Sequence, residues 1–373
     1  TEQLFELPES YLAIIEEAKK VAQQVAPYAH HADEADHFDP NVRQILAESG
    51  LCSLTVPKKF GGRFEEVDSL AVTVVREQLA YESAHVDSMF CMQGIGSYAL
   101  AQAGSPALQE AWLPAVGRLE SIAALGLTEP DVGSDLRAIT TTIEVEGDLL
   151  RINGHKSFIT NAGDADFYTM LGKETVGGEI AYSLVLIPAS TPGLSVSHPH
   201  QIIAPHVLGD VIMKDVMVPS SHRIGEPGKG FNLVLATLST FRVSVAGAAI
   251  GIAQAALDEA TKHAAGREQF GVPLARLGGI PAQLANSWAE IEMARALTYR
   301  AAAASARDAR ANLYLSSLAK AGATEMSGRV VDRANWRIVF SSHVAETREQ
   351  ARAEVEHGLL RWHNEYNVGT LQR

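Results

Sequence analysis

The first third of the chain has the apolar periodicity of α-helices. Apolar residues recur every three or four positions near the start, at Leu12, Ile15, Ala18, Ala22 and Val25. This spacing places them on one helical face, and Pro8 stands where a first helical turn tolerates it. Turn-forming residues interrupt the pattern at 56–62, and the stretch 86–103 is rich in Ser, Gly, Ala and Met. We therefore predict closely packed helices over residues 1–123.

Strand patterns replace the helical ones between residues 124 and 228. Apolar residues at 143–145 and 149–152 flank the turn residues 146–148, which predicts a hairpin. The dipeptide Asn153-Gly154 is a further turn signal. The segment 124–228 is predicted to be a small all-β domain.

Helical patterns return from residue 229 onward. Residues 231–265 contain no proline and are predicted to form one long helix, in which Gly247 and Gly251 are one turn apart. A glycine costs a helix interior about 1 kcal/mol relative to alanine. We therefore expect another helix or a ligand to approach these glycines closely. Two more helices are predicted at about 282–307 and 311–331.

This order predicts an α+β protein. It has an N-terminal helical domain at 1–123, a central β domain at 124–228 and a C-terminal helical domain at 229–373. Strands and helices do not alternate as they do around a parallel sheet, and no Gly-x-Gly-x-x-Gly motif follows a predicted strand. A dinucleotide-binding βαβ fold is therefore disfavoured.

Composition and charge narrow the function classes. The 373 residues are 46% hydrophobic and 20% charged, and 31 Lys and Arg against 44 Asp and Glu give a net charge of −13. Such a surface repels phosphate backbones and anionic lipids, so we expect neither nucleic acid nor a membrane as partner. Cys52 and Cys91 are the two cysteines. With no disulfide framework, no apolar run near the roughly 20 residues of a spanning helix, and no signal-peptide pattern, we expect a cytoplasmic protein.

Two stretches of the β domain carry candidate chemistry. The loop 125–135 reads Leu-Gly-Leu-Thr-Glu-Pro-Asp-Val-Gly-Ser-Asp and offers hydroxyl and backbone donors to a carbonyl or phosphate oxygen. On the next predicted strand, Phe158 and Thr160 share one face. A flat ring beside a hydroxyl suits a planar heteroaromatic cofactor. The simpler alternatives are an ordinary turn and a core aromatic residue.

A third stretch stands at the end of a predicted helix and reads Arg-Glu-Gln-Phe-Gly at 267–271. Arg267 either complements the helix dipole or clamps a phosphate. Three histidines, His198, His200 and His206, lie close together in the sequence. Their spacing matches no tight metal site, so we expect exposed loop histidines and no metal.

Together these stretches resemble the acyl-CoA dehydrogenase family over residues 8–333. The family's motifs are the Thr-Glu-Pro-x-x-Gly-Ser-Asp loop, the (Trp/Phe)-Ile-Thr-Asn strand and the Arg-x-x-Phe-Gly helix end, and the segment 57–62 matches its Pro-x-x-(Tyr/Phe)-Gly-Gly. The resemblance implies a helical bundle, a small β-barrel-like domain and a second helical bundle. It also implies FAD-dependent α,β-dehydrogenation of an acyl thioester, with a Cα proton removed by a carboxylate and hydride passing from Cβ to flavin N5.

The resemblance also implies site residues and partners. The implied FAD ligands are Leu127, Thr128, Gly133, Ser134, Phe158, Ile159 and Thr160, with Arg267, Gln269 and Phe270 on a neighbouring subunit. The implied substrate contacts are Ser134, Ser239, Thr240, Phe241 and Arg242. Partners would be acyl-CoA or an acyl-carrier protein, electron-transfer flavoprotein or oxygen as acceptor, and further copies of the chain in a homotetramer or dimer.

The chain departs from the family in the residues that would supply the catalytic base. One family position for the carboxylate is Phe241, and the C-terminal Tyr-Glu-Gly-Thr motif is replaced by the sequence 366–370. Glu365 is the nearest carboxylate and the candidate base, with an exposed terminal residue as the alternative. The family's Gly-rich segment after residue 334 is missing, and the tail 335–373 loosely resembles part of a luciferase-like flavin monooxygenase.

Another departure lies at the expected substrate entrance. The family's Gly-x-Arg turn is replaced by Ile202, Ile203 and Ala204, which makes a carrier-protein-bound acyl group an alternative to acyl-CoA. Two other functions therefore stay open besides dehydrogenation. One is a flavin monooxygenase or oxidase of the same fold, and the other is a catalytically silent assembly subunit.

Overall fold

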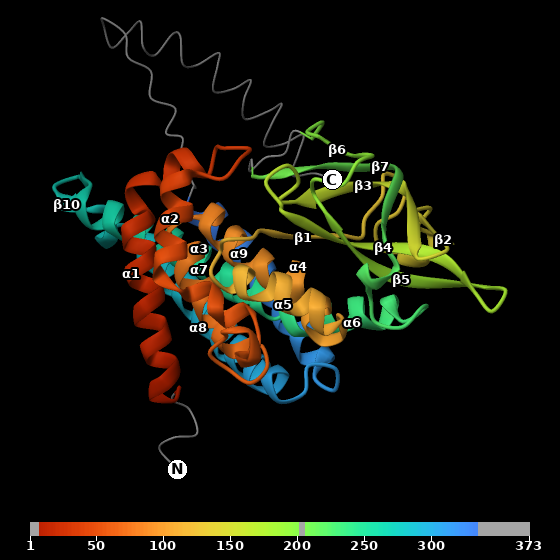
Figure 1. Cartoon of the computed structure of the whole chain (residues 1–373). Helices are drawn as coiled ribbons and strands as arrows, with labels where there is room; N and C mark the ends of the chain where they lie inside the picture. The colour runs from red at the N-terminus through yellow and green to blue at the C-terminus, as the bar shows by residue number, and fades with distance from the viewer. Residues whose placement is uncertain (1–6, 201–205, 335–373) are drawn as a thin grey trace, which may run out of the picture. The chain divides into compact units, whose positions relative to one another are not determined.

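The computed structural model of the protein describes residues 7–200 and 206–334 (Figure 1). Helices precede and follow a central block of strands, as the sequence predicts. The helices are α1 (Glu9–Ala32), α2 (Pro40–Ser49), α3 (Ser69–Glu82), α4 (Ala84–Ala103), α5 (Pro106–Gly117), α6 (Gly230–Phe241), α7 (Ser244–Gly266), α8 (Ile280–Arg307) and α9 (Leu313–Ala334). The strands are β1 (Ala123–Gly126), β2 (Thr142–Glu146), β3 (Leu149–Thr160), β4 (Phe167–Val176), β5 (Glu179–Pro188), β6 (Leu194–Ser197), β7 (Leu208–Pro219), β8 (Arg223–Ile224), β9 (Glu268–Gln269) and β10 (Val272–Pro273).

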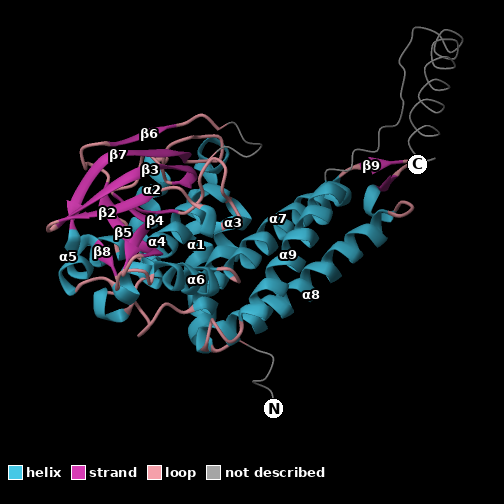
Figure 2. Ribbon diagram, turned by 90° about the vertical axis from the view of Figure 1, so that its right-hand side faces the viewer, coloured by secondary structure: helices cyan, strands magenta, loops and turns pink. Residues whose placement is uncertain are grey.

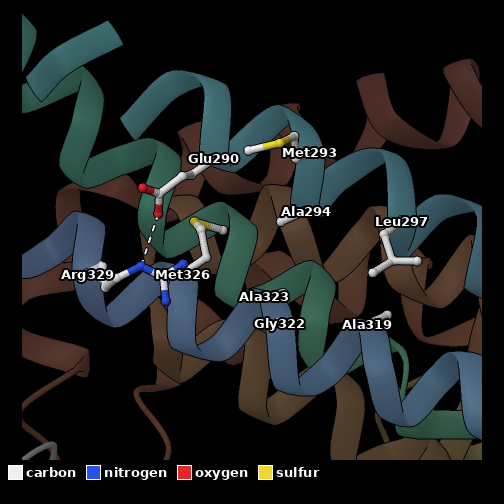
Figure 3. Close-up of a pocket in the computed structure, with 9 residues that line it drawn as sticks. All are labelled: Glu290, Met293, Ala294, Leu297, Ala319, Gly322, Ala323, Met326 and Arg329. Atoms are coloured by element: carbon white, nitrogen blue, oxygen red, sulfur yellow. Dashed lines mark hydrogen bonds and ion pairs between the residues drawn. The ribbon is translucent and has the colours of Figure 1, made fainter. Parts of the chain in front are cut away.

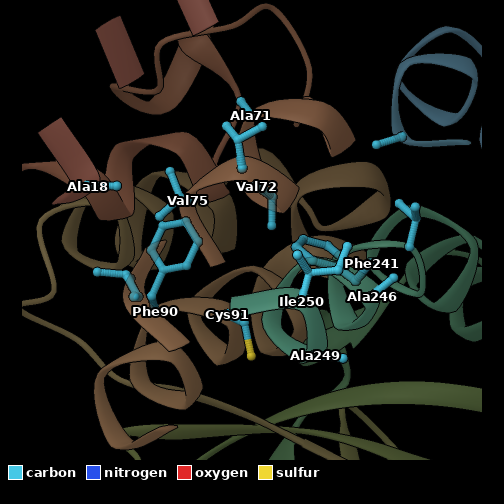
Figure 4. Close-up of a cluster of buried hydrophobic side chains, with 14 of the residues drawn as sticks. Ala18, Ala71, Val72, Val75, Phe90, Cys91, Phe241, Ala246, Ala249 and Ile250 are labelled. Atoms are coloured by element: carbon cyan, nitrogen blue, oxygen red, sulfur yellow. The ribbon is translucent and has the colours of Figure 1, made fainter. Parts of the chain in front are cut away.

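Every helix except α5 contributes to one apolar core. Side chains from α1, α3, α4, α6 and α7 meet in it, among them Val75, Phe90 and Ile250 (Figure 4). Helices α7, α8 and α9 run side by side (Figure 2). On α1 the predicted apolar face is shifted slightly, because Leu12 is 48% exposed and Ile14 is buried instead.

The glycine pair of α7 marks a close helix contact, as predicted. A Cβ added to Gly247 would lie 2.4 Å from the carbonyl oxygen of Thr73, and one at Gly251 would lie 2.1 Å from that of Glu77. Both carbonyls belong to α3, so another helix rather than a ligand occupies the space. The cost of glycine in α7 is offset by this backbone approach.

The predicted single helix at 231–265 is wrong in one respect. It is divided into α6 and α7 at Arg242 and Val243, where Ser244 Oγ donates a hydrogen bond to the Phe241 carbonyl at 2.7 Å and competes with the main chain for that acceptor. The stretch Gly230–Gly266 is long and apolar enough to cross a membrane by length and composition, with a window of mean hydropathy 1.7 that is 67% buried inside the protein. This corrects the expectation that no segment approaches that length, and packing within the core accounts for its apolar character.

Strands β1 to β8 form one mixed sheet in the order β6-β7-β3-β2-β4-β5-β8, with β1 paired to β4, and β9 and β10 form a separate two-stranded sheet. The predicted hairpin is confirmed, since β2 and β3 pair with Ile143 opposite Ile152. The turn predicted at Asn153-Gly154 is wrong, because both residues lie inside β3. Gly154 is needed there for a different reason, since a Cβ would lie 2.3 Å from the Thr141 hydroxyl.

Helix α4 joins the helical core to the sheet. A Cβ on Gly96 would lie 2.7 Å from that of Ala123 in β1, and one on Gly94 would lie 2.4 Å from the Phe241 ring. The small residues at 86–103 therefore allow close packing, as predicted. Gly96 lets α4 approach β1, and Gly94 lets it approach α6. The described residues up to Ala334 accordingly form one compact unit. The domain limits at 123/124 and 228/229 stay a prediction.

Replacing Gly251 with Ala should destabilise the protein by about 1–3 kcal/mol, because the new methyl group overpacks the α3–α7 contact. Urea unfolding followed by circular dichroism measures this. Gly328→Ala on α9 is the matched control, since an added Cβ there meets nothing within 4 Å. It should be neutral or stabilising by up to about 1 kcal/mol, and equal effects of the two variants would contradict the close-packing explanation.

Candidate active site

The loop after β1 is held against β3 by hydrogen bonds to two main-chain carbonyls of the loop. The carbonyl of Leu127 accepts a hydrogen bond from Lys156 Nζ at 3.1 Å. The carbonyl of Thr128 accepts one from the Ser157 backbone N–H at 2.9 Å. The two candidate stretches found in the sequence therefore lie side by side, with Thr128 next to the residue that precedes Phe158.

A bulge in β3 turns the Phe158 ring outward. Pairing with β7 shifts between Lys156 and Ile159, and Phe158 has a φ of 58°. Lys156 and Ser157 are both buried, at 0% and 3% exposure, whereas Phe158 is 52% exposed. A positive φ at a bulky residue costs about 1–3 kcal/mol and persists only where its surroundings impose it.

The loop 127–134 and the outward side of β3 carry hydroxyl groups that have no hydrogen-bond partner among the described residues. Thr160 is half-buried, and the Ile159 side chain is buried in the sheet core at 2% exposure. Among the described residues, none exchanges a hydrogen bond with the hydroxyl of Thr128, Ser134 or Thr160. Gly133 and Ser134 are exposed on the loop. The exposed Phe158 ring and the unbonded hydroxyl groups near it fit the binding of a flavin ring. The buried Ile159 side chain could not contact that flavin, so any contact from Ile159 would come through its backbone.

Below this loop, Glu129 and Lys156 form a buried ion pair. Their charged atoms are 2.9 Å apart, with the side chains 2% and 0% exposed. Glu129 also accepts hydrogen bonds from the backbone and hydroxyl groups of Thr140 and Thr141, at 2.6–3.0 Å. Burial raises the pKa of Glu129, but the bonds from Thr141 and Thr140 and the charge of Lys156 outweigh it and lower that pKa to about 2. Burial lowers the pKa of Lys156 to about 8. The sequence patterns indicate no function for either residue.

On the other side of the bulge, Asp210 of β7 gathers three donors. Ser157 Oγ donates to its Oδ1 at 2.6 Å, His200 Nε2 lies 2.6 Å from the same oxygen, and His155 Nε2 lies 2.8 Å from Oδ2. Burial raises the pKa of Asp210, but these hydrogen bonds outweigh it and lower the pKa to about 2.

The prediction of exposed loop histidines is wrong for His200. Its side chain is only 15% exposed, and its ring stacks on Phe158 with centroids 4.0 Å apart. His198 is exposed and bonds the Leu208 carbonyl. In the described ranges 7–200 and 206–334, no three His, Cys, Asp or Glu side chains are grouped to hold a metal.

The segment 267–271 begins a small hairpin after α7. Arg267 follows the last helical residue and donates its backbone N–H to the His263 carbonyl at 2.9 Å, and β9 then pairs with β10. Gln269 is exposed, and the Phe270 ring at the tip is 90% exposed. No hydrogen bond in the described part of the chain connects this hairpin with the loop 127–134.

The predicted substrate residues at the end of α6 have unequal environments. The hydroxyls of Ser239 and Thr240 donate to carbonyls of their own helix, at 2.7 and 3.0 Å. Phe241 is 3% exposed and contacts the edge of the Tyr98 ring. Arg242 is half-buried and donates to Ser317 Oγ at 3.2 Å, with no carboxylate of the described residues in ion-pair distance. Ser239 and Thr240 are bonded within their own helix, whereas the Arg242 guanidinium has only a hydroxyl partner among the described residues. Of the predicted substrate residues, Arg242 is therefore the one best able to bind a ligand.

Several sequence predictions fall outside the described residues. These are the candidate base Glu365, the replaced turn at Ile202, Ile203 and Ala204, and the luciferase-like resemblance of the tail 335–373.

Comparison with known families identifies the chain. The N-terminal domain model of acyl-CoA dehydrogenase matches residues 8–120, the middle domain model matches 124–216 and the C-terminal domain model matches 228–335. The chain belongs to the acyl-CoA dehydrogenase family. The match ends at residue 335, next to the point where the sequence departs from the family motifs.

Individual relatives agree with this assignment. The chain is 34% identical over 331 residues to cyclohex-1-ene-1-carbonyl-CoA dehydrogenase of Syntrophus aciditrophicus, covering 87% of this chain and 79% of the relative. Its fold matches butyryl-CoA dehydrogenase of Megasphaera elsdenii with a TM-score of 0.82 and 27% identity, over 99% and 100% of the two chains. A structure described as the electron transferring flavoprotein of Acidaminococcus fermentans matches with a TM-score of 0.81 and 25% identity, over 96% and 99%.

The predicted architecture, FAD cofactor and dehydrogenase activity are thereby confirmed. The protein is an FAD-dependent oxidoreductase of the acyl-CoA dehydrogenase type. The comparisons do not favour the monooxygenase or the silent assembly subunit.

Replacing Glu129 with Gln should destabilise this acyl-CoA dehydrogenase by about 3–5 kcal/mol, because Lys156 would stay buried without its counter-charge. Urea unfolding measures the loss. The double variant Glu129→Gln/Lys156→Met removes both charges and should recover a large part of it. If the single variant were as stable as the unchanged protein, the pair would not hold the loop.

Acid should weaken the fold through Glu129 and Asp210. The pKa of each is about 2, below the ordinary values of 4.5 and 3.8. Over that interval the unfolded chain binds more protons than the native one, so stability should fall as pH drops from about 5 towards 2. Melting temperatures between pH 7 and pH 3 test this. Asp210→Asn should flatten part of the decline, and an unchanged profile would contradict the assignment.

Proposed function

We propose that the loop 127–134 and the outward side of β3 bind FAD, with Phe158 packed against the isoalloxazine ring. The supporting observation is the bond between the Thr128 carbonyl and the Ser157 N–H, 2.9 Å long. It sets an exposed aromatic ring beside hydroxyl groups that the described protein leaves unbonded.

The role of each residue is carried over from the family resemblance. Leu127 and Thr128 would bind the pyrimidine end of the flavin, Thr160 would bind near N5 through its hydroxyl, and Ile159 would contribute through its backbone. Gly133 and Ser134 would contact the flavin side and the acyl thioester. On a neighbouring subunit, Arg267, Gln269 and Phe270 would bind FAD.

When bound, FAD would supply the acceptor for the hydride that leaves Cβ of the acyl group. The protein's part is to orient the thioester and to polarise its carbonyl by donors placed where enolate charge develops. Ser134, Ser239, Thr240, Phe241 and Arg242 form the proposed substrate side. Arg242 has the strongest support, because its charge has only a hydroxyl partner among the described residues. Phe158 keeps water from the ring face that it covers.

A carboxylate must remove the Cα proton, and Phe241 cannot do so. Its ring is buried against α4, and no acid replaces it at that position. We propose Glu365 as the base, since it is the carboxylate nearest to the place of the family's C-terminal Glu in the sequence.

We further propose acyl-CoA as substrate and an electron-transfer flavoprotein as electron acceptor. Curated relatives are named for cyclohexene-carbonyl-CoA and glutaryl-CoA, and one structural relative is described as an electron transferring flavoprotein. A carrier-protein-bound acyl group and oxygen remain the competing substrate and acceptor. A role in fatty acid metabolism is proposed from the acyl-CoA dehydrogenase family alone. A cytoplasmic location accords with the two buried free cysteines, and the absence of nucleic acid or membrane partners accords with the net charge of −13.

A homo-oligomer, tetramer or dimer, is also proposed. Phe270 is 90% exposed at a hairpin tip, where an apolar ring gains by burial against a second copy. A groove of about 210 Å³ lies between α8 and α9, with an ion pair of Glu290 and Arg329 at one end (Figure 3). Met293, in the lining of this groove, is 66% exposed. Light scattering that gave the mass of a single chain would contradict this proposal.

The activity is tested by anaerobic bleaching of the purified holoenzyme with a panel of acyl-CoA thioesters. Loss of the flavin absorption on adding a saturated acyl-CoA is the expected result. Bleaching only by NAD(P)H or free reduced flavin would indicate a monooxygenase, and a flavin-free protein would indicate a silent subunit. Glu365→Gln should retain FAD and lose bleaching by at least about 100-fold, as expected for removal of a general base. An unchanged rate would exclude Glu365.

A further inference from the structure

The imidazole of His200 covers one face of the Phe158 ring. The two ring planes are inclined by only 22°, and their centroids are 4.0 Å apart. Phe158 nevertheless keeps 52% of its surface exposed. A ring so placed has one face occupied by the protein and the other free for a ligand.

His200 is itself firmly oriented. Its Nε2 lies 2.6 Å from Asp210 Oδ1 and 3.3 Å from Ser157 Oγ. A carboxylate of low pKa only accepts hydrogen bonds, so Nε2 must carry a proton and point at Asp210. The imidazole plane is therefore fixed by a buried residue of β7 and not by Phe158 alone.

We infer that His200 is a positioning residue for FAD, which acts by holding Phe158 in the orientation that presents its free face to the isoalloxazine. This inference rests on the proposed flavin contact of Phe158. An exposed ring at a strand bulge would otherwise sample several rotamers, and ordering it on binding lowers affinity. The stack removes that cost before FAD arrives.

The chain supplies a matched control on the same carboxylate. His155 bonds the other oxygen of Asp210 at 2.8 Å, but its side chain is 42% exposed. The described residues show no ring stacked on His155. Removing either histidine takes one hydrogen bond from Asp210, and only removal of His200 frees Phe158.

The experiment titrates FAD into the full-length apoprotein and follows flavin fluorescence, with the visible circular dichroism of the bound flavin as a second readout. His200→Ala should weaken FAD binding by about 3- to 10-fold, in keeping with the worth of an aromatic pair, and alter the visible dichroism. His155→Ala should change affinity less than about 2-fold. His200→Phe retains a flat ring and should restore most of the affinity and the dichroic spectrum.

Each contrary result has its own meaning. Equal weakening by His200→Ala and His155→Ala, without rescue by His200→Phe, would show that both act through Asp210 and would overturn the inference. The inference would also be overturned if Phe158→Ala weakened FAD binding and His200→Ala did not. If Phe158→Ala leaves affinity and dichroism unchanged, the proposed flavin contact itself fails and the inference falls with it.

Discussion

The buried ion pair of Glu129 and Lys156 is the constraint on which the site depends. Two charges withdrawn from water must be paired and hydrogen-bonded, and any shift of one relative to the other is costly. Glu129 belongs to the loop and Lys156 to β3, with their charged atoms 2.9 Å apart. The pair therefore fixes the loop against the strand, and it does so below the surface where a cofactor would displace only water. Thr128 reaches its place beside Phe158 as a consequence.

The same strand must satisfy a second carboxylate on its other side. Ser157 donates to Asp210 at 2.6 Å, directly after Lys156 has turned inward to Glu129. His155 and Ser157 both bond Asp210, whereas Lys156 between them bonds Glu129, so these three side chains keep the alternation of a regular strand. The register with β7 shifts between Lys156 and Ile159, and within that interval Phe158 takes its positive φ. The backbone strain therefore lies at the residue whose ring is turned outward.

Glycines set the distance between the helices and the sheet. Gly96 lets α4 approach β1, the strand that leads into the cofactor loop, and Gly94 accommodates the Phe241 ring from α6. At the position where some family members place the catalytic carboxylate, this chain therefore has a core residue. The base, if it is Glu365, comes from a part of the chain far away in the sequence. Phe241 therefore serves the packing of the helices, and the proposed base stands elsewhere in the chain.

The sequence by itself determined what depends on local patterns: the order of helices, strands and helices, the close approach at Gly251, and the pairing of the loop motif with the Phe158 strand through the family resemblance. It could not determine how neighbours override local signals. Gly154 has the chemistry of a turn, yet the contact with Thr141 keeps it in a strand. His200 looks like a loop histidine until the pairing of β6 with β7 sets Asp210 beside it and the ring of Phe158, from the earlier strand β3, stacks on it. Burial, partner and orientation of a polar side chain are set by residues remote in the sequence, and only the tertiary structure brings those residues together.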